Sequence, residues 1–260
     1  MGSGVIEFPW WDYRGDWTKN RAPVIEEGTI TIHVNGEELA TIMATPVEQE
    51  QLGLGFLRNE GLIQTMAEVR DVHISDDGCC VEIWLDHAFE VPDRMIITSG
   101  CGGGVTFDDP SIGITPLDDP LCISPEQLMG LFDSLQTSDS LYARARGVHT
   151  AGLAVEDEIL AVAEDVGRHN CIDKLMGQCM LRGIETGGKL LLATGRVSSE
   201  MLRKGARMGC PIIASRNSPT SMSVDMAQAW NITLVGYVRR TTLRVYSHPE
   251  RLQCGANGQV

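Results

Sequence analysis

Residues 29–44 alternate between apolar and polar side chains, a pattern typical of half-buried β-strands. The alternation centres on Asn35-Gly36, the dipeptide that most strongly favours the tight turn of a β-hairpin. The first 25 residues are aromatic and irregular, and we expect them to lie across the surface of a domain or a partner. The elements predicted next are two strands within 29–44, a helix from Pro46 to about Arg58, a hairpin over 69–75 and 79–86, and a strand at 94–98. Residues 1–98 are therefore predicted to form a smaller, β-rich α+β module.

Beyond residue 123 the pattern changes, and predicted strands alternate with predicted helices. Residues 99–123 are rich in Gly, Pro and Asp, and a connection of that length is usually functional or disordered. The elements predicted beyond it are helix 124–136, strands 148–155 and 158–163, helix 168–182, strand 189–193, helix 198–208, strand 211–215, helix 219–229 and strand 232–238. This alternation predicts a largely parallel sheet with helices on its faces, so residues 124–260 are interpreted as an α/β domain.

Composition and charge narrow the classes of function. Hydrophobic residues make up 43% of the 260 residues, no run is long enough to span a membrane, and no signal peptide opens the chain. We therefore expect a cytoplasmic protein without a membrane partner. The net charge of −14 argues against a nucleic-acid partner, but the charge is unevenly distributed. Residues 1–159 carry 8 basic and 28 acidic side chains, whereas residues 160–260 carry 13 basic and 7 acidic ones.

The eight cysteines are predicted to be free thiols in a reducing compartment. No pair has the Cys-x-x-Cys spacing of a zinc site, so we expect no metal. Most of the cysteines fall in predicted core elements, but Cys101 lies among four glycines, in Gly100-Cys101-Gly102-Gly103-Gly104. A thiol on so flexible a backbone suits a nucleophile or carrier that meets two partners in turn. A spacer with an incidental cysteine fits the local sequence equally well.

Arginines recur where predicted strands give way to helices. The three junctions contain Arg168 with His169, Thr194 with Arg196, and Ser215 with Arg216, and the last long strand ends at Arg239 and Arg240, followed by Arg244. Ligands bind at the carboxyl ends of such strands, helix N-termini favour anions, and guanidinium groups bind phosphate oxygens in pairs. A single arginine near a helix start is more often a surface residue. Three in corresponding positions predict a phosphate-binding crevice.

Two histidines and one glutamate are further candidates. His169 and Asp173 are four residues apart on a predicted helix, so we expect the Asp173 carboxylate to orient the imidazole. His149 precedes a predicted strand, and a lone histidine is more often structural than chemical. Glu60 ends a helix before Gly61 and is interpreted as either a functional residue or a capping element.

Several segments together resemble the FdhD/NarQ family of formate dehydrogenase accessory sulfurtransferases. The matching segments are Gly55-Phe56-Leu57, Glu60-Gly61-Leu62-Ile63, the stretch from Thr98 to Gly104, Val148-His149-Thr150-Ala151, Glu164-Asp165-Val166-Gly167-Arg168-His169-Asn170, Asp173-Lys174, Thr194-Gly195-Arg196, Ser198-Ser199-Glu200-Met201 and Tyr246-Ser247-His248-Pro249. The resemblance covers about residues 25–252, and its most specific part is the Glu-Asp-Val-Gly-Arg-His run.

The resemblance implies a sulfurtransferase. Such proteins accept sulfur from a cysteine desulfurase as a cysteine persulfide and pass it to the molybdenum or tungsten bis-molybdopterin guanine dinucleotide cofactor of formate dehydrogenase. The persulfide cysteine of the family aligns with Cys101, and a second cysteine common in the family is replaced here by Gly104. The resemblance also implies a homodimer and an α/β main domain similar in fold to cytidine deaminases, with a mixed sheet and flanking helices. The zinc motif of those enzymes is absent from this sequence.

The family's cofactor-binding stretch aligns with Tyr237-Val238-Arg239-Arg240-Thr241-Thr242. Its usual final arginine is Thr242 here, and we expect Arg244, two residues on, to replace it from the same strand face. The GDP-like moieties of the cofactor are predicted to bind this stretch together with Arg168, His169, Thr194, Arg196, Ser215 and Arg216. Two alternatives are a chaperone that binds the cofactor without covalent sulfur chemistry, and a regulator that binds a purine nucleotide.

Overall fold

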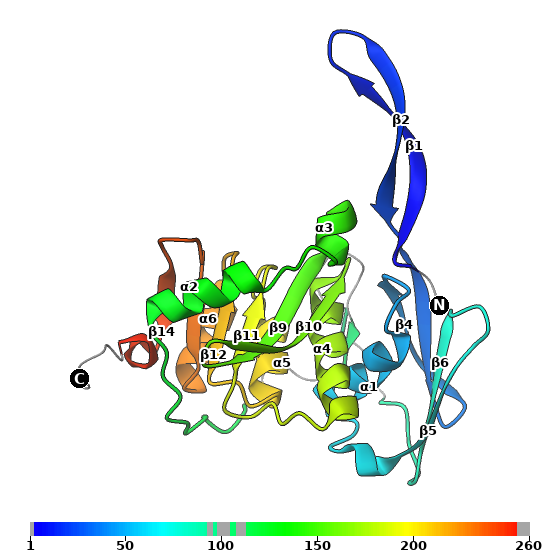
Figure 1. Ribbon diagram of the computed structural model, residues 1–260. Coiled ribbons are helices and arrows are strands. Elements are labelled where there is room, and N and C mark those ends of the chain that lie inside the picture. The colour runs from blue at the N-terminus through cyan, green and yellow to red at the C-terminus, as the bar shows by residue number, and fades with distance from the viewer. Residues whose placement is uncertain (1–2, 93–95, 98–104, 108–112, 254–260) are drawn as a thin grey trace.

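A six-stranded mixed sheet forms the centre of the protein, seen here in a computed structural model that describes residues 3–92, 96–97, 105–107 and 113–253 (Figure 1). The strand order is β10-β9-β11-β12-β13-β14. The strands are β9 (His149–Val155), β10 (Glu158–Asp165), β11 (Leu190–Ala193), β12 (Ile212–Ser215), β13 (Thr233–Gly236) and β14 (Arg244–Ser247). Only β11, β12 and β13 run parallel to one another. The largely parallel sheet predicted from the alternation of strands and helices is therefore wrong, because β9 and β14 pair antiparallel with β11 and β13. The mixed sheet with flanking helices that the family resemblance implies is confirmed.

Helices cover both faces of this sheet and give three layers. The helices α4 (Arg168–Arg182), α5 (Ser199–Arg207) and α6 (Ser221–Ala229) pack on one face, and α2 (Pro125–Ser134) packs on the other (Figure 1). Successive residues of a strand point to opposite faces, and β11 shows this directly. Leu191 belongs to the core shared with α4 and α5, whereas Leu190 and Leu192 belong to the core shared with α2. The predicted helices are confirmed, but the short helix α3 (Leu141–Ala145) was not predicted.

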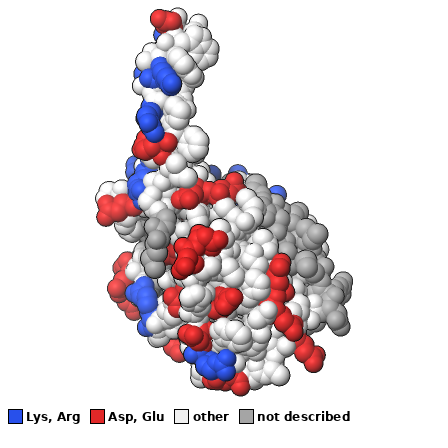
Figure 2. All heavy atoms as spheres, turned by 90° about the vertical axis from the view of Figure 1, so that its right-hand side faces the viewer, with Lys and Arg blue, Asp and Glu red and all other residues white. Residues whose placement is uncertain are grey.

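The N-terminal module contains a four-stranded sheet in the order β4-β3-β6-β5. Its elements are β3 (Gly28–Val34), β4 (Glu37–Ala44), α1 (Gln49–Asn59), η1 (Met66–Glu68), β5 (Val69–Ile74) and β6 (Cys80–Leu85). Both predicted hairpins are present. The turn between β3 and β4 has positive φ angles at Asn35 (51°) and Gly36 (88°), as the sequence predicts. Asp and Glu side chains are numerous on the face of the molecule shown in Figure 2.

Residues 5–25 form a regular β-ribbon that projects from the rest of the molecule (Figure 1). Its strands are β1 (Val5–Tyr13) and β2 (Trp17–Ile25), and each residue of β1 pairs with one of β2. The prediction of an irregular surface segment is wrong. The strand pattern was missed because Pro9 and the charged residues interrupt the alternation of apolar and polar side chains. Phe8 and Trp11 are 52% and 61% exposed, so neither face of the ribbon is buried in this chain.

Helices α1 and α4 join the module to the main sheet, and glycines allow them to touch. A Cβ atom on Gly55 of α1 would overlap the carbonyl oxygen of Asp173, and one on Gly177 of α4 would overlap that of Gln51. The two helix backbones therefore meet without intervening side chains. None of the helices among the described residues is both long and apolar enough to cross a membrane.

Candidate functional site

The three predicted strand-to-helix junctions lie along one edge of the six-stranded sheet. Ala193, at the end of β11, pairs with Ser215 at the end of β12 and with Ala151 near the start of β9. The end of β10 reaches the same edge, because Asp165 pairs with His149. We call the predicted residues gathered here the basic edge: Arg168, His169, Thr194, Arg196, Ser215, Arg216, Arg239 and Arg244.

Hydrogen bonds between neighbouring turns fix the shape of the basic edge. The Ser215 hydroxyl donates to the carbonyl oxygen of Gly195 at 2.6 Å, and the Val238 amide donates to the carbonyl oxygen of Ser215 at 3.0 Å. The Thr194 hydroxyl accepts a hydrogen bond of 2.9 Å from the backbone amide of Thr150. Ser215, Thr194 and Val238 therefore hold the turns together, and this role leaves the arginines to face a ligand.

Three arginine side chains of the basic edge, those of Arg216, Arg239 and Arg244, are held by neutral groups. Arg216 donates to the carbonyl oxygen of Phe132 at 2.7 Å and lies over its ring. Arg239 donates to the carbonyl oxygens of Arg216 and Val238, and Arg244 stacks 4.3 Å from the centre of the Tyr237 ring. Within the described part of the chain, none of these three arginines pairs with a carboxylate. Carbonyls and rings orient a guanidinium without cancelling its charge, so the positive charge is left for an anion.

A depression of about 390 Å³ continues the basic edge. Tyr237, Arg239, Thr242, Leu243 and Arg244 line it. Tyr237 has a positive φ of 53°, a strained conformation for a bulky residue that often marks a functional site. The structure thus brings Thr242 and Arg244 to one depression.

The remaining members of the predicted cofactor-binding stretch lie elsewhere. Arg240 turns toward α2 and lies 3.9 Å from the Asp133 carboxylate, and Thr241 is exposed outside the lining of the depression.

Two arginines of the strand-to-helix junctions differ in exposure. Arg196 is exposed, whereas Arg168 is 8% exposed and lies against the backbone of Gly195.

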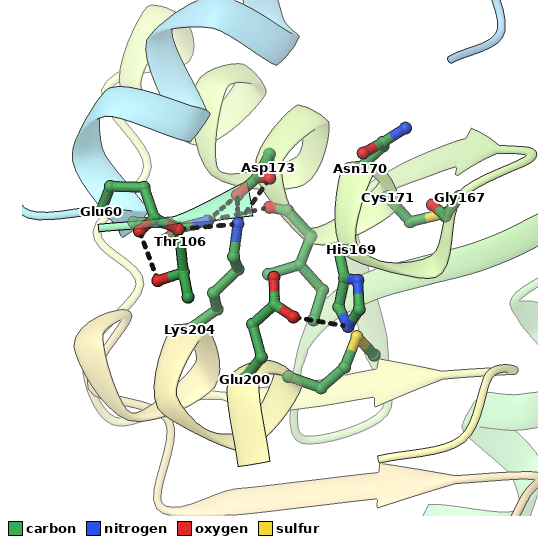
Figure 3. Close-up of polar contacts among 12 residues, drawn as sticks. Glu60, Thr106, Gly167, His169, Asn170, Cys171, Asp173, Glu200 and Lys204 are labelled. Atoms are coloured by element: carbon green, nitrogen blue, oxygen red, sulfur yellow. Dashed lines mark hydrogen bonds and ion pairs between the residues drawn. The ribbon is translucent and has the colours of Figure 1, made fainter. Parts of the chain in front are cut away.

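His169 is oriented by Glu200 and not by Asp173, which corrects the sequence prediction. Its Nε2 lies 3.3 Å from the Glu200 carboxylate and 3.2 Å from the Ser198 hydroxyl (Figure 3). Burial, together with Lys204 and Arg168, lowers the pKa of His169 to about 2, so the ring is neutral at physiological pH. The hydrogen-bond partner of Nε2 is the Ser198 hydroxyl, and the Glu200 carboxylate lies beside this pair.

Asp173 instead belongs to a group of buried charges between the two sheets. Its carboxylate accepts hydrogen bonds of 2.7 and 2.8 Å from Lys204, which also lies 3.3 Å from Glu60 (Figure 3). A second pair joins Lys174 to Asp165 at 2.6 Å, with both side chains fully buried. We call these five residues the buried ion layer. Burial alone would lower the pKa of Lys204, but Asp173, Glu60 and Glu200 raise it above its ordinary value, so Lys204 stays charged.

Glu60 is more than a capping residue. It is 5% exposed, and its carboxylate accepts hydrogen bonds from the Thr106 hydroxyl at 2.7 Å and the Phe107 amide at 3.1 Å. Strands β7 (Ile96–Ile97) and β8 (Val105–Thr106) pair with each other. The chain that joins them contains Cys101, the predicted carrier, which lies outside the described residues.

Of the described cysteines, three are buried, Cys79 is exposed, Cys80 is half-buried, and Cys122 is disulfide-bonded. Cys171, Cys179 and Cys210 are buried, as predicted, and burial raises the pKa of each thiol, that of Cys179 to about 11. These three are therefore poor nucleophiles. Cys122 takes part in a disulfide, so the expectation that every cysteine is free is wrong.

Comparison with known proteins decides the family. The sequence profile of the FdhD/NarQ family matches residues 25–253. This chain belongs to the FdhD/NarQ family. A relative from Staphylococcus haemolyticus is 36% identical over 97% of this chain and 97% of that protein, and one from Bacillus subtilis is 34% identical over 94% and 95%. Both FdhD/NarQ relatives are named sulfur carrier protein FdhD.

The same family is found among solved structures. A crystal structure described as that of a formate dehydrogenase accessory protein from Desulfotalea psychrophila matches with a TM-score of 0.77 and 27% identity. The match covers 95% of this chain and 99% of that chain. The mixed sheet, its flanking helices and the smaller N-terminal module are therefore the architecture of an FdhD/NarQ protein.

Proposed function

We propose that this FdhD/NarQ protein is a sulfurtransferase that carries sulfur on Cys101. In the loading step, the Cys101 thiolate attacks the terminal sulfur of a persulfide on a cysteine desulfurase. A new S–S bond forms at Cys101, the desulfurase thiolate leaves and takes up a proton, and no net oxidation occurs. The names of the relatives support this role. Delivery of the sulfur as sulfide needs two electrons, for which we propose a reductant of the thiol class.

The proposed acceptor is the molybdenum or tungsten bis-molybdopterin guanine dinucleotide cofactor, bound as a substrate. The observation that supports an anionic substrate is the set of arginines at the basic edge that are oriented only by carbonyls and rings. Phosphates of the GDP-like moieties would meet Arg196, Arg216 and Arg239, and the depression beside Tyr237 would receive part of a nucleotide. His169 would offer neutral hydrogen-bonding capacity beside them.

The proposed partners follow from this role. A cysteine desulfurase supplies the sulfur, the catalytic subunit of formate dehydrogenase receives the finished cofactor, and the exchange takes place in the cytoplasm. A homodimer is also proposed. One face of the β-ribbon, formed by Ile6, Phe8 and Trp10 with the opposite Ala22 and Val24, supports it, because so apolar a face is suited to a second copy. The likeness of the main domain to cytidine deaminases and the lack of a zinc site also remain proposals.

Intact-mass analysis tests the carrier role. The protein is incubated with a cysteine desulfurase and cysteine, and we expect a mass gain of one sulfur that is lost in Cys101→Ser and kept in Cys79→Ser, which removes an exposed thiol elsewhere. A protein that binds GDP but never gains sulfur would instead be a chaperone that binds the cofactor without covalent chemistry. The replacement of the family's second cysteine by Gly104 is the observation that favours this alternative.

A further inference from the structure

The turn between β10 and α4 is fastened by one carboxylate. Asp165, the last residue of β10, is fully buried. One of its carboxylate oxygens accepts hydrogen bonds from the Gly167 amide at 2.7 Å and from the Asn170 side-chain amide at 2.8 Å. Gly167, His169 and Asn170 lie together at the start of α4 (Figure 3). The Asp165 carboxylate therefore fixes the turn that carries Arg168 and His169 of the basic edge.

The N-terminal module holds the same turn from the other side. Thr45 directly follows β4 and is fully buried. Its backbone amide donates to the second oxygen of Asp165 at 3.0 Å, and its hydroxyl accepts a hydrogen bond of 3.2 Å from the Val166 amide. The Met43 carbonyl oxygen accepts a further hydrogen bond of 2.8 Å from the Asn170 side chain. All three bonds cross from the end of β4 to the β10–α4 turn, so the module determines where this turn lies.

The β10–α4 turn in its turn supports the next junction of the basic edge. The Nε2 atom of His169 lies 3.2 Å from the hydroxyl of Ser198, which is the N-cap of α5. A Cβ atom on Gly195 would lie only 2.9 Å from the Cβ atom of Arg168, so the glycine lets the two turns touch. Arg196 lies between these two contacts along the chain. The position of Arg196 therefore depends on the β10–α4 turn.

We propose that Thr45 is a positioning residue for this part of the basic edge. Through Asp165 and the Val166 amide, it sets the orientation in which His169 and Arg196 meet the phosphate oxygens of a ligand. Hydrogen bonds to phosphate need donors that point in a defined direction, so a small displacement of the turn lowers affinity. Thr45 is fully enclosed and acts only through the turn. This inference rests on the proposed binding of GDP-like moieties and adds to it a residue of the N-terminal module.

A merely structural role for Thr45 makes a different prediction. If its hydroxyl only stabilised the contact between the module and the main sheet, its loss would lower the free energy of unfolding and leave the GDP affinity of the folded protein unchanged. Thr45→Val removes the hydroxyl and keeps the shape of the side chain, whereas Thr45→Ser retains the hydroxyl. Thr186→Val is a matched control, because the Thr186 hydroxyl is also buried and donates to the carbonyl oxygen of Met208 at 2.6 Å. Thr186 precedes β11, at the edge of the sheet opposite the basic edge.

The test measures the affinity for GDP by titration calorimetry, at a temperature at which urea denaturation shows each protein to be folded. We expect the unchanged protein, Thr45→Ser and Thr186→Val to bind GDP with the same affinity. In Thr45→Val, the loss of one hydrogen bond to the turn should weaken the affinity about three- to tenfold. Both valine variants should lose stability, so stability alone does not separate them and GDP affinity does.

Equal GDP affinity in Thr45→Val and the unchanged protein would overturn the positioning role, as would an equal loss of affinity in Thr186→Val. If Thr45→Val fails to fold, Asn170→Ala gives the second reading, because it removes the bond to the Met43 carbonyl and leaves every charge in place. It should weaken GDP binding to a similar extent, and unchanged affinity would again overturn the proposal. If the unchanged protein does not bind GDP, the proposed substrate site is refuted together with the positioning role. GDP binding that Thr45→Val leaves unaffected refutes the positioning role alone.

Discussion

The basic edge and the buried ion layer contain similar cations in opposite surroundings. In the buried ion layer, Lys174 and Lys204 lie within 2.8 Å of carboxylate oxygens and are almost wholly enclosed. At the basic edge, Arg216 and Arg239 are oriented by backbone carbonyl oxygens. A buried cation that is neutralised by a carboxylate contributes to the stability of the fold. A cation that is oriented without being neutralised is available to an anionic ligand. Residues of one chemical type can therefore be assigned different roles.

Removing one member of the buried ion layer should have the largest effect on stability. Lys204→Met keeps the length of the side chain but leaves Asp173 and Glu60 buried without their cation. We expect the free energy of unfolding to fall by about 3–5 kcal/mol, measured by urea denaturation. Arg240→Met is the control, because Arg240 forms only an exposed pair with Asp133 and its loss should change stability little. Similar losses in both variants would contradict the distinction between buried and exposed cations.

Arginines of the basic edge should affect ligand binding more than stability. Arg216→Ala should weaken GDP binding at least about tenfold, the effect of losing one or two hydrogen bonds to phosphate, and should leave persulfide loading intact. Arg196→Ala should act in the same direction. Arg182→Ala is the control, because Arg182 is exposed at the far end of α4. Unchanged GDP affinity in both Arg216→Ala and Arg196→Ala would refute the anion-binding edge.

The neutral His169 should make stability depend on pH in a defined window. Its pKa is about 2 in the folded protein and about 6.5 in an unfolded chain. The unfolded state therefore binds the extra proton below pH 6.5, and stability is lost as the pH falls from 6.5. Between pH 6 and pH 5 the free energy of unfolding should drop by up to about 1.4 kcal/mol from this group.

His169→Gln tests whether His169 causes this pH dependence, because a glutamine amide can still hydrogen-bond to the Ser198 hydroxyl but does not titrate. Urea denaturation at pH 7, 6 and 5 should show a shallower dependence in His169→Gln. The slope should remain in part, since burial and Arg168 also lower the pKa of His149. An identical dependence in both proteins would show that His169 does not titrate on unfolding.

Local patterns in the sequence predicted much of the fold. The Asn35-Gly36 turn and the alternation of strands with helices need only neighbouring residues, and both are confirmed. The strand directions were partly wrong, because whether β9 and β14 run parallel or antiparallel depends on connections that hydrophobic periodicity does not encode. The β-ribbon was missed because its alternation is exposed on both faces and interrupted by Pro9.

The candidate site was predicted where residues follow strand ends and missed where distant residues meet. Arg168, Arg196 and Arg216 occupy corresponding junctions, so topology alone gathers them. The partner of His169 was predicted as Asp173, four residues away, but the structure supplies Glu200 from another helix. Glu60 and Lys204 are 144 residues apart, and no local spacing in the sequence predicts their contact. The sequence feature that could have indicated this contact was the Glu60 carboxylate at the end of an apolar helix.

The most direct test of anion binding at the basic edge is hydrogen exchange, followed by mass spectrometry, with and without GDP. We predict that GDP slows exchange in peptides covering 193–199, 214–220 and 237–244, which contain the turns of the basic edge. Peptides covering 49–60 and 171–176, which contain Glu60, Asp173 and Lys174 of the buried ion layer, should change little, because that layer is already compensated and enclosed. Protection confined to other parts of the chain, or none at saturating GDP, would contradict the claim that the basic edge holds the anionic substrate.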